Sequence, residues 1–152
     1  MGRPAELTKK DLIELGITNV SETGIVETIP EKTVSYSDTT KKTRYGYKTY
    51  WLVQIYDHDT YTQRRKSNPK ATSGTKTLVL SRVIWAWNFD GSNRPTNGNY
   101  CPAFTAPANL DIDHINDNSE VNDFTNLQLL TRKQNLAKRR GYMNQYERSY
   151  KE

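Results

Sequence analysis

The first apolar positions of the chain predict a short helix. In LTKKDLIELG, residues 7–16, Thr8 can cap the helix and Asp11 stands three residues later, which together form a capping box. Leu7 and Leu12 are spaced for a hydrophobic staple across the cap. Gly16 can end the helix because glycine readily adopts the left-handed conformation found after helix ends. We therefore expect a helix ending at Gly16.

Residues 22–67 show the alternation of apolar and polar side chains that is typical of β-strands. Strands are expected in the segments GIVETI, TVSYS, GYKTYWLVQIYD and YTQRRKS, with Gly, Pro, Asp and Thr-rich breaks between them. The face expected to be shared in the longest strand carries Tyr45, Tyr47, Trp51, Val53 and Ile55. A further strand, TKTLVLS, and a short apolar helix, RVIWAWNF, follow.

The C-terminal half begins with a long segment, residues 90–109, that has the composition of a loop and is of a length often linked to function or mobility. After it, LDIDHI and LQLLT read as two strands separated by the turn-forming NDNSEVNDFTN. RKQNLAKRR then reads as a helix, with Thr131 as its cap and Gln134 completing a capping box. We therefore predict an α+β fold, with a β-rich N-terminal part followed by a ββα unit.

Length and the distribution of charge indicate how the chain is divided into segments. The 152 residues, 34% hydrophobic, suit a single compact domain with a modest core. We expect three segments in it: residues 1–107 with the N-terminal helix and β-rich part, residues 108–141 with the ββα unit, and a basic tail at 142–152. Residues 41–76 hold nine Lys or Arg and two Asp, whereas residues 108–130 hold five acidic residues and no basic one. The basic flanks suit a polyanion and the acidic centre suits a cation.

Several classes of protein are disfavoured. Cys101 is the chain's single cysteine, so neither an internal disulfide nor a cysteine zinc cluster can form. The sequence has no apolar stretch of membrane-spanning length, and its N-terminus lacks the apolar core of a signal peptide. We therefore expect an intracellular protein without a membrane partner.

Four polar side chains converge on the predicted ββα unit. Asp113 and His114 stand at the end of its first strand, Asn126 at the start of the second, and Asn135 in the helix. All four suit a metal ion or a water molecule. Since neighbours on a regular strand point to opposite faces, Asp113 and His114 cannot both face the helix unless the strand bends there.

These residues and their spacing resemble the HNH endonucleases, in particular the phage-type homing endonucleases with the ββα-metal fold. The resemblance rests on DH at 113–114, NL at 126–127 and QN at 134–135, with intervals of 12 and 9 residues from His114 to Asn126 and on to Asn135. LGIT near the start and VLSRVIWAWNF before the loop extend it weakly. Where the family often has His-Arg, this chain has Ser81-Arg82, which puts in doubt any role for a second histidine.

The resemblance implies a role for each of the four residues. His114 would be the general base that deprotonates water, Asp113 and Asn135 would hold a divalent metal on the scissile phosphate, and Asn126 would bridge the turn and orient the histidine. Elementary chemistry agrees, since imidazole can accept a proton near pH 7 and oxygen ligands favour Mg²⁺ or Mn²⁺. Zinc, which is normally held by several His or Cys, is disfavoured in a chain with two histidines.

The resemblance thus implies cleavage of phosphodiester bonds in double-stranded DNA by a phage or prophage protein in a bacterial cytoplasm. Interleaved cations and aromatics in the β-rich part, together with the cations of the last helix, are the candidate DNA contacts. The candidate residues are Arg44, Lys48, Arg64, Arg65, Lys66, Arg132, Lys133, Lys138, Arg139 and Arg140. A monomer and a homodimer both remain open.

A calcium loop starting at Asp111 would have Asn116 in place of the required glycine and Asn122 in place of the final glutamate, which disfavours it. His58 is expected to be a solvated turn residue. The remaining polar residues of the turn, which are Asn116, Asp117, Asn118, Asn122 and Asp123, are expected to shape it. A non-catalytic DNA-binding protein with a vestigial HNH unit is the alternative function, and an RNA-directed nuclease is not excluded.

Overall fold

The described chain begins with a short strand and a capped helix. A computed structural model describes residues 5–43, 46–57, 66–68 and 75–139. Strand β1 (Leu7–Thr8) leads into helix α1 (Lys9–Glu14), where Thr8 and Asp11 form the expected capping box. Gly16, at φ 99°, follows the helix in the left-handed region, as predicted from the sequence.

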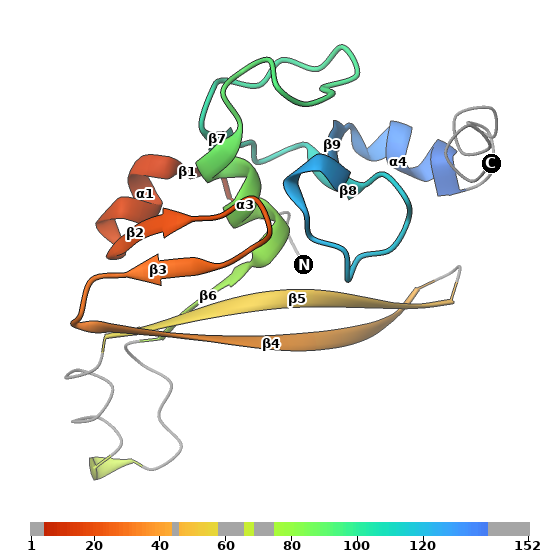
Figure 1. Cartoon of the computed structure of the whole chain (residues 1–152). Helices are drawn as coiled ribbons and strands as arrows, with labels where there is room; N and C mark the ends of the chain where they lie inside the picture. Colours follow the sequence, from red (N-terminus) through yellow and green to blue (C-terminus); the bar gives the residue numbers. More distant parts are fainter. Residues whose placement is uncertain (1–4, 44–45, 58–65, 69–74, 140–152) are drawn as a thin grey trace.

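The N-terminal part is rich in strands. β2 (Ile17–Val20) and β3 (Val26–Thr28) form one antiparallel pair, and β4 (Lys32–Thr43), β5 (Gly46–Asp57) and β6 (Thr75–Val79) form a three-stranded sheet in that order. Strand β4 continues well past the predicted TVSYS, because its Thr- and Lys-rich end pairs residue by residue with β5. Since β6 pairs only with residues 52–56 of β5, the far end of the hairpin is a two-stranded ribbon. Figure 1 shows this ribbon running beneath the C-terminal strands and helix.

Helix α3 (Leu80–Asn88) lies at the centre of the core. All of its side chains except that of Asn88 are buried, and the buried Arg82 among them donates to backbone carbonyls of Ala5, Ala106 and Pro107. Trp85 stacks on Phe89 at 4.6 Å and meets Phe124 edge-on at 6.1 Å between ring centroids. The buried apolar side chains form one cluster that includes Val53 from the sheet and Leu127 from the C-terminal part.

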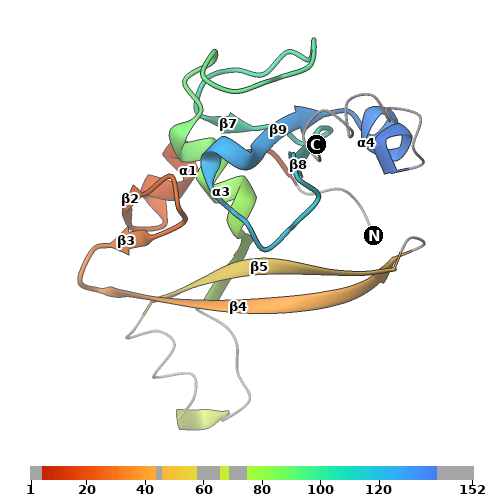
Figure 2. The same cartoon turned by 45° about the vertical axis from the view of Figure 1, so that its right-hand side comes forward.

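The C-terminal part is the predicted ββα unit. After the short β7 (Thr105–Ala106), which pairs with β1, strand β8 (Asp111–His114) pairs antiparallel with β9 (Leu127–Leu130). The 3-10 turn η1 (Phe124–Asn126) precedes β9, and helix α4 (Arg132–Arg139) follows it. In both views this unit lies over the ribbon end of β4 and β5 (Figures 1 and 2). The α+β prediction, with a β-rich part before a ββα unit, is confirmed.

The long loop between α3 and β7 is held by hydrogen bonds to β9 and to the 3-10 turn before it. Leu129 N donates to Pro95 O at 3.0 Å, and Asn97 Nδ2 donates to Leu129 O at 3.0 Å. Arg94 reaches Thr125 O at 2.7 Å and Leu127 O at 3.2 Å. The loop therefore borders β9 along its free edge.

Candidate active site

Strand β8, the turn after it and helix α4 place the predicted site residues. Helix α4 begins with the predicted capping box, since Gln134 N donates to Thr131 Oγ1 at 3.0 Å and Thr131 N donates to Gln134 Oε1 at 2.8 Å. This cap fixes the start of the helix. Asn135 and Lys138, three residues apart and thus on one face, both have buried side chains.

Asp113 and His114 have different partners, as strand geometry requires. Each is only 4% exposed. Asp113 Oδ2 accepts from Lys138 Nζ on α4 at 2.7 Å and from Gln128 Nε2 on β9 at 2.9 Å. The His114 ring instead meets Asn122 in the turn, with 2.9 Å between Nε2 and Asn122 Oδ1. The carboxylate is therefore held by the helix side of the unit and the imidazole by the turn.

The surroundings of His114 favour a neutral imidazole. Burial lowers its pKa from the usual value near 6.5, and the contacts with Asn122 and Asp113 offset this only in part. Because Asn122 Nδ2 donates to Ser119 O at 3.4 Å, its Oδ1 is oriented to accept a hydrogen bond from His114 Nε2–H. In that tautomer Nδ1 is the basic nitrogen. The site thus holds a base that is unprotonated at pH 7.

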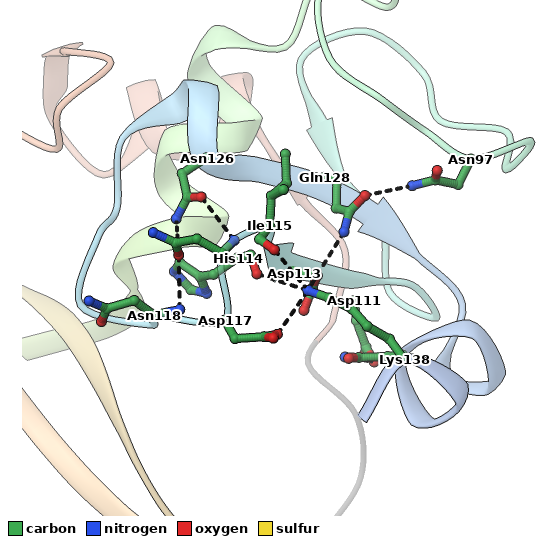
Figure 3. Close-up of polar contacts among 12 residues, drawn as sticks. Asn97, Asp111, Asp113, His114, Ile115, Asp117, Asn118, Asn126, Gln128 and Lys138 are labelled. Carbon is green, nitrogen blue, oxygen red and sulfur yellow. Dashed lines mark hydrogen bonds and ion pairs between the residues drawn. The ribbon is translucent and has the colours of Figure 1, made fainter. Parts of the chain in front are cut away.

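Asn126 holds the turn between the two strands closed (Figure 3). Its Nδ2 donates to Asn116 Oδ1 at 3.0 Å and to Val121 O at 2.9 Å, and its Oδ1 accepts from Asn116 N at 3.2 Å. Its backbone carbonyl accepts from Ile115 N at 2.7 Å. Asn126 has no hydrogen bond to the His114 ring in the described structure, so any effect on the base passes through the turn.

Asn135 pairs with Asp111, a residue that the sequence reasoning did not select. Asn135 Nδ2 donates to Asp111 Oδ2 at 3.0 Å, and Arg132 Nε lies 3.5 Å from the same oxygen. The other amide atom, Asn135 Oδ1, is buried and accepts no hydrogen bond from the described residues. A buried acceptor without a donor is costly unless a ligand satisfies it. This orphaned oxygen fits the amide ligand expected for a divalent cation.

A cleft of about 360 Å³ lies between the ββα unit and the ribbon. Asp111, Asp113, His114, Arg132 and Asn135 line one side. From the ribbon, two rows of cross-strand neighbours line the other side, namely Thr39 with Tyr50 and Lys41 with Lys48. The turn and the ribbon are joined directly, because Ser119 Oγ donates to Thr49 O.

The predicted DNA contacts fall into separate groups. Lys48 and Arg132 line the cleft, and Lys133 is exposed on α4. Lys66 is also exposed but lies in a helical turn, so the strand predicted there does not include it. Arg44, Arg64, Arg65, Arg140 and the turn residue His58 lie outside the described residues, as does the side chain of Arg139.

Lys138 requires a correction. Its side chain is 0% exposed and its ammonium lies 2.7 Å from Asp113 Oδ2 and 2.9 Å from Asp117 Oδ1. It therefore does not offer its charge to a DNA backbone. The same contacts correct the interpretation of the turn, where Asp117 binds Lys138 and Asn122 binds His114 in addition to shaping the backbone. The signal that could have identified Lys138 is its place three residues after Asn135, on the face of the helix that must meet β8.

The oxygen ligands suit a hard divalent cation. Within the described part of the chain, no cluster of three or more His, Cys, Asp or Glu side chains forms a metal centre. Asp113 and Asn135 could supply one carboxylate and one amide oxygen, which is the incomplete protein shell usual for Mg²⁺.

None of the helices in the described ranges has the length and apolar character needed to cross a bilayer.

Comparison with known proteins agrees with this geometry. No curated protein and no solved structure matches the chain. Residues 105–137, from β7 into α4, match the model of the HNH endonuclease family, and the matched segment contains all four of Asp113, His114, Asn126 and Asn135.

Proposed function

We propose that the chain is a metal-dependent HNH nuclease that hydrolyses phosphodiester bonds of double-stranded DNA. The observation that carries the proposal is a cleft lined by a buried imidazole, a carboxylate and the residue that holds an orphaned amide oxygen. The spacing shared with phage-type homing endonucleases supports a related role and a phage origin.

His114 supplies the base. Its neutral ring accepts the proton of a water molecule as the water oxygen attacks phosphorus, and general base catalysis of this kind contributes about 10²–10⁴-fold. Asn122 holds the ring through Nε2, which leaves Nδ1 for the proton. Asp113 and Asn135 would hold Mg²⁺ or Mn²⁺, and a cation bound there supplies charge neutralisation for the phosphate and the leaving oxygen.

The ribbon supplies the positive charge that a DNA substrate requires. Lys41 and Lys48 are direct cross-strand neighbours, so the ribbon carries two positive charges side by side at this position. Both line the cleft that contains His114. We assign them, together with Arg132 and Lys133, to contacts with the DNA backbone that hold the duplex across the cleft.

A cleavage assay on supercoiled plasmid tests the proposal. We expect nicked or linear product with Mg²⁺, none with EDTA, and a loss of at least about 100-fold in His114→Gln. Circular dichroism establishes that the variant folds. Cleavage by His114→Gln at the wild-type rate would refute the assigned base. A parallel digest of RNA of matched length shows which nucleic acid is preferred.

One observation favours the alternative, a non-catalytic DNA-binding protein. The ammonium of Lys138 already neutralises Asp113, so the carboxylate does not need a metal for charge balance. A mobility-shift assay in EDTA followed by addition of Mg²⁺ separates the two functions. A nuclease degrades the shifted DNA once the metal is present, whereas a binding protein leaves it intact.

A further inference from the structure

The ammonium of Lys138 lies in a cage of oxygens beneath the cleft (Figure 3). It contacts Asp113 Oδ2 at 2.7 Å, Asp117 Oδ1 at 2.9 Å, His114 O at 3.1 Å and Ile115 O at 3.2 Å. A charged side chain that is 0% exposed is stable only with such partners. The two carboxylates and two carbonyls therefore fix the ammonium beside Asp113.

Gln128 holds the same carboxylate from the neighbouring strand. It is 0% exposed and is the register partner of Asp113 across β8 and β9. Its Nε2 donates to Asp113 Oδ2 at 2.9 Å, while its Oε1 accepts from Asn97 Nδ2 at 3.1 Å. Asn97 is fixed in turn by its bond to Leu129 O. The long loop thus determines which end of the Gln128 amide faces Asp113.

Both donors approach one oxygen of the carboxylate. Among the described residues, none donates a hydrogen bond to Asp113 Oδ1, although Asp113 lines the cleft. Asn135, one helical turn before Lys138, carries the orphaned Oδ1 and lines the same cleft. One face of α4 therefore places a cation against Oδ2 of Asp113 and carries, on the cleft-lining Asn135, an amide oxygen without a donor.

We propose that Lys138 and Gln128 are positioning residues that hold Asp113 by Oδ2 and leave Oδ1 as the oxygen that binds the divalent metal. The inference rests on the proposed function. A carboxylate gripped on one oxygen cannot rotate freely, so its second oxygen keeps a fixed position for a single-oxygen contact with a cation. Substitution of such supporting residues typically costs about 10–100-fold in metal affinity or activity.

Metal binding in the full-length chain tests the proposal directly. We expect Lys138→Met and Gln128→Met to weaken Mn²⁺ binding by about 10-fold or more in titration calorimetry without DNA. Lys133→Met, which removes an exposed charge from the same helix, is the matched control and should bind Mn²⁺ as the wild type does. Plasmid cleavage should need correspondingly more Mn²⁺ for half-maximal rate in the two variants, with most of the rate recovered at saturating Mn²⁺.

The outcomes separate the two proposals. Wild-type protein that neither binds Mn²⁺ nor cuts DNA contradicts the proposed function itself. Wild-type protein that binds and cuts, with both variants binding Mn²⁺ equally well, overturns only the positioning role. Tighter Mn²⁺ binding by Lys138→Met also overturns it, because the ammonium would then be a competitor of the metal. If Lys138→Met does not fold, Gln128→Met, which introduces no unpaired charge, decides the question alone.

Discussion

The Asn126 amide offers a sharp test of how the turn supports the base. Asn126→Asp keeps the shape and the accepting oxygen but removes both donated hydrogen bonds, at 3.0 Å to Asn116 Oδ1 and 2.9 Å to Val121 O. Each lost bond costs about 0.5–1.5 kcal/mol, and the new carboxylate oxygen faces two acceptors. We therefore expect the free energy of unfolding to fall by about 2–3 kcal/mol, or roughly 4–12 °C in Tm for a chain of this size.

The same substitution should reduce cleavage more than it reduces metal binding. The turn that Asn126 closes carries Asn122, which holds the His114 ring. A small displacement of the base can cost about 100-fold in rate, whereas neither Asp113 nor Asn135 is bonded to Asn126. Urea unfolding, plasmid cleavage and Mn²⁺ titration measure the three effects.

Asn118→Asp is the matched control for this experiment. It makes the same change of charge in the same turn, but its side chain is exposed and acts as an acceptor, from Glu120 N at 3.0 Å. A carboxylate keeps that bond, so the change in stability should stay within about 0.5 kcal/mol. Wild-type stability and activity in Asn126→Asp, or equal losses in the two variants, would refute the reasoning.

Three further results are expected. Lys138→Met should cost about 3–5 kcal/mol because it leaves buried Asp113 unpaired, and the additional change Asp113→Asn should restore part of that loss in a double-mutant cycle. Lys48→Ser should reduce the slope of log K for DNA against log salt by about 0.9, with a smaller effect for Lys42→Ser on the other face of the ribbon, as measured by fluorescence anisotropy. The pKa of His114 is lower in the folded chain than in the unfolded chain, so as the pH falls the unfolded chain takes up the proton at a higher pH. In EDTA, the free energy of unfolding should therefore decrease as the pH drops below about 6.5. His114→Gln should lose less stability between pH 7.5 and 5.5 in urea unfolding.

The sequence predicts those parts of the fold that depend on near neighbours. Both capping boxes lie within four consecutive residues, Thr8–Asp11 and Thr131–Gln134, and both form as predicted. The polar end of β4 was assigned to a break because its strand character comes from pairing with β5. The segment before β7 is a loop as predicted, but the sequence does not show that its hydrogen-bond partners lie at residues 125–129. Long-range partners decide both segments.

The site shows the same limit. Residue type and spacing selected Asp113, His114, Asn126 and Asn135, and the structure brings three of them to one cleft and Asn126 to the turn. Gln128 was not selected, and Lys138 was assigned to the DNA backbone instead of to Asp113. On the sequence, Gln128 is a polar residue within a strand, and Lys138 is the first of three consecutive cations. Only the folded chain shows that both donate to a single oxygen.

The acidity of residues 108–130 now has a different explanation from the one its position between basic segments suggested. Asp111 meets Arg132 at 3.5 Å, and Asp113 and Asp117 share Lys138, so α4 supplies cations to the acidic strand and turn. Net charge is therefore a weak argument for a metal in this segment. The stronger argument is the geometry of two oxygens, Asp113 Oδ1 and Asn135 Oδ1, that the described protein leaves without donors. If a divalent cation binds here, it completes a polar network that Lys138 and Gln128 satisfy only on its inner side.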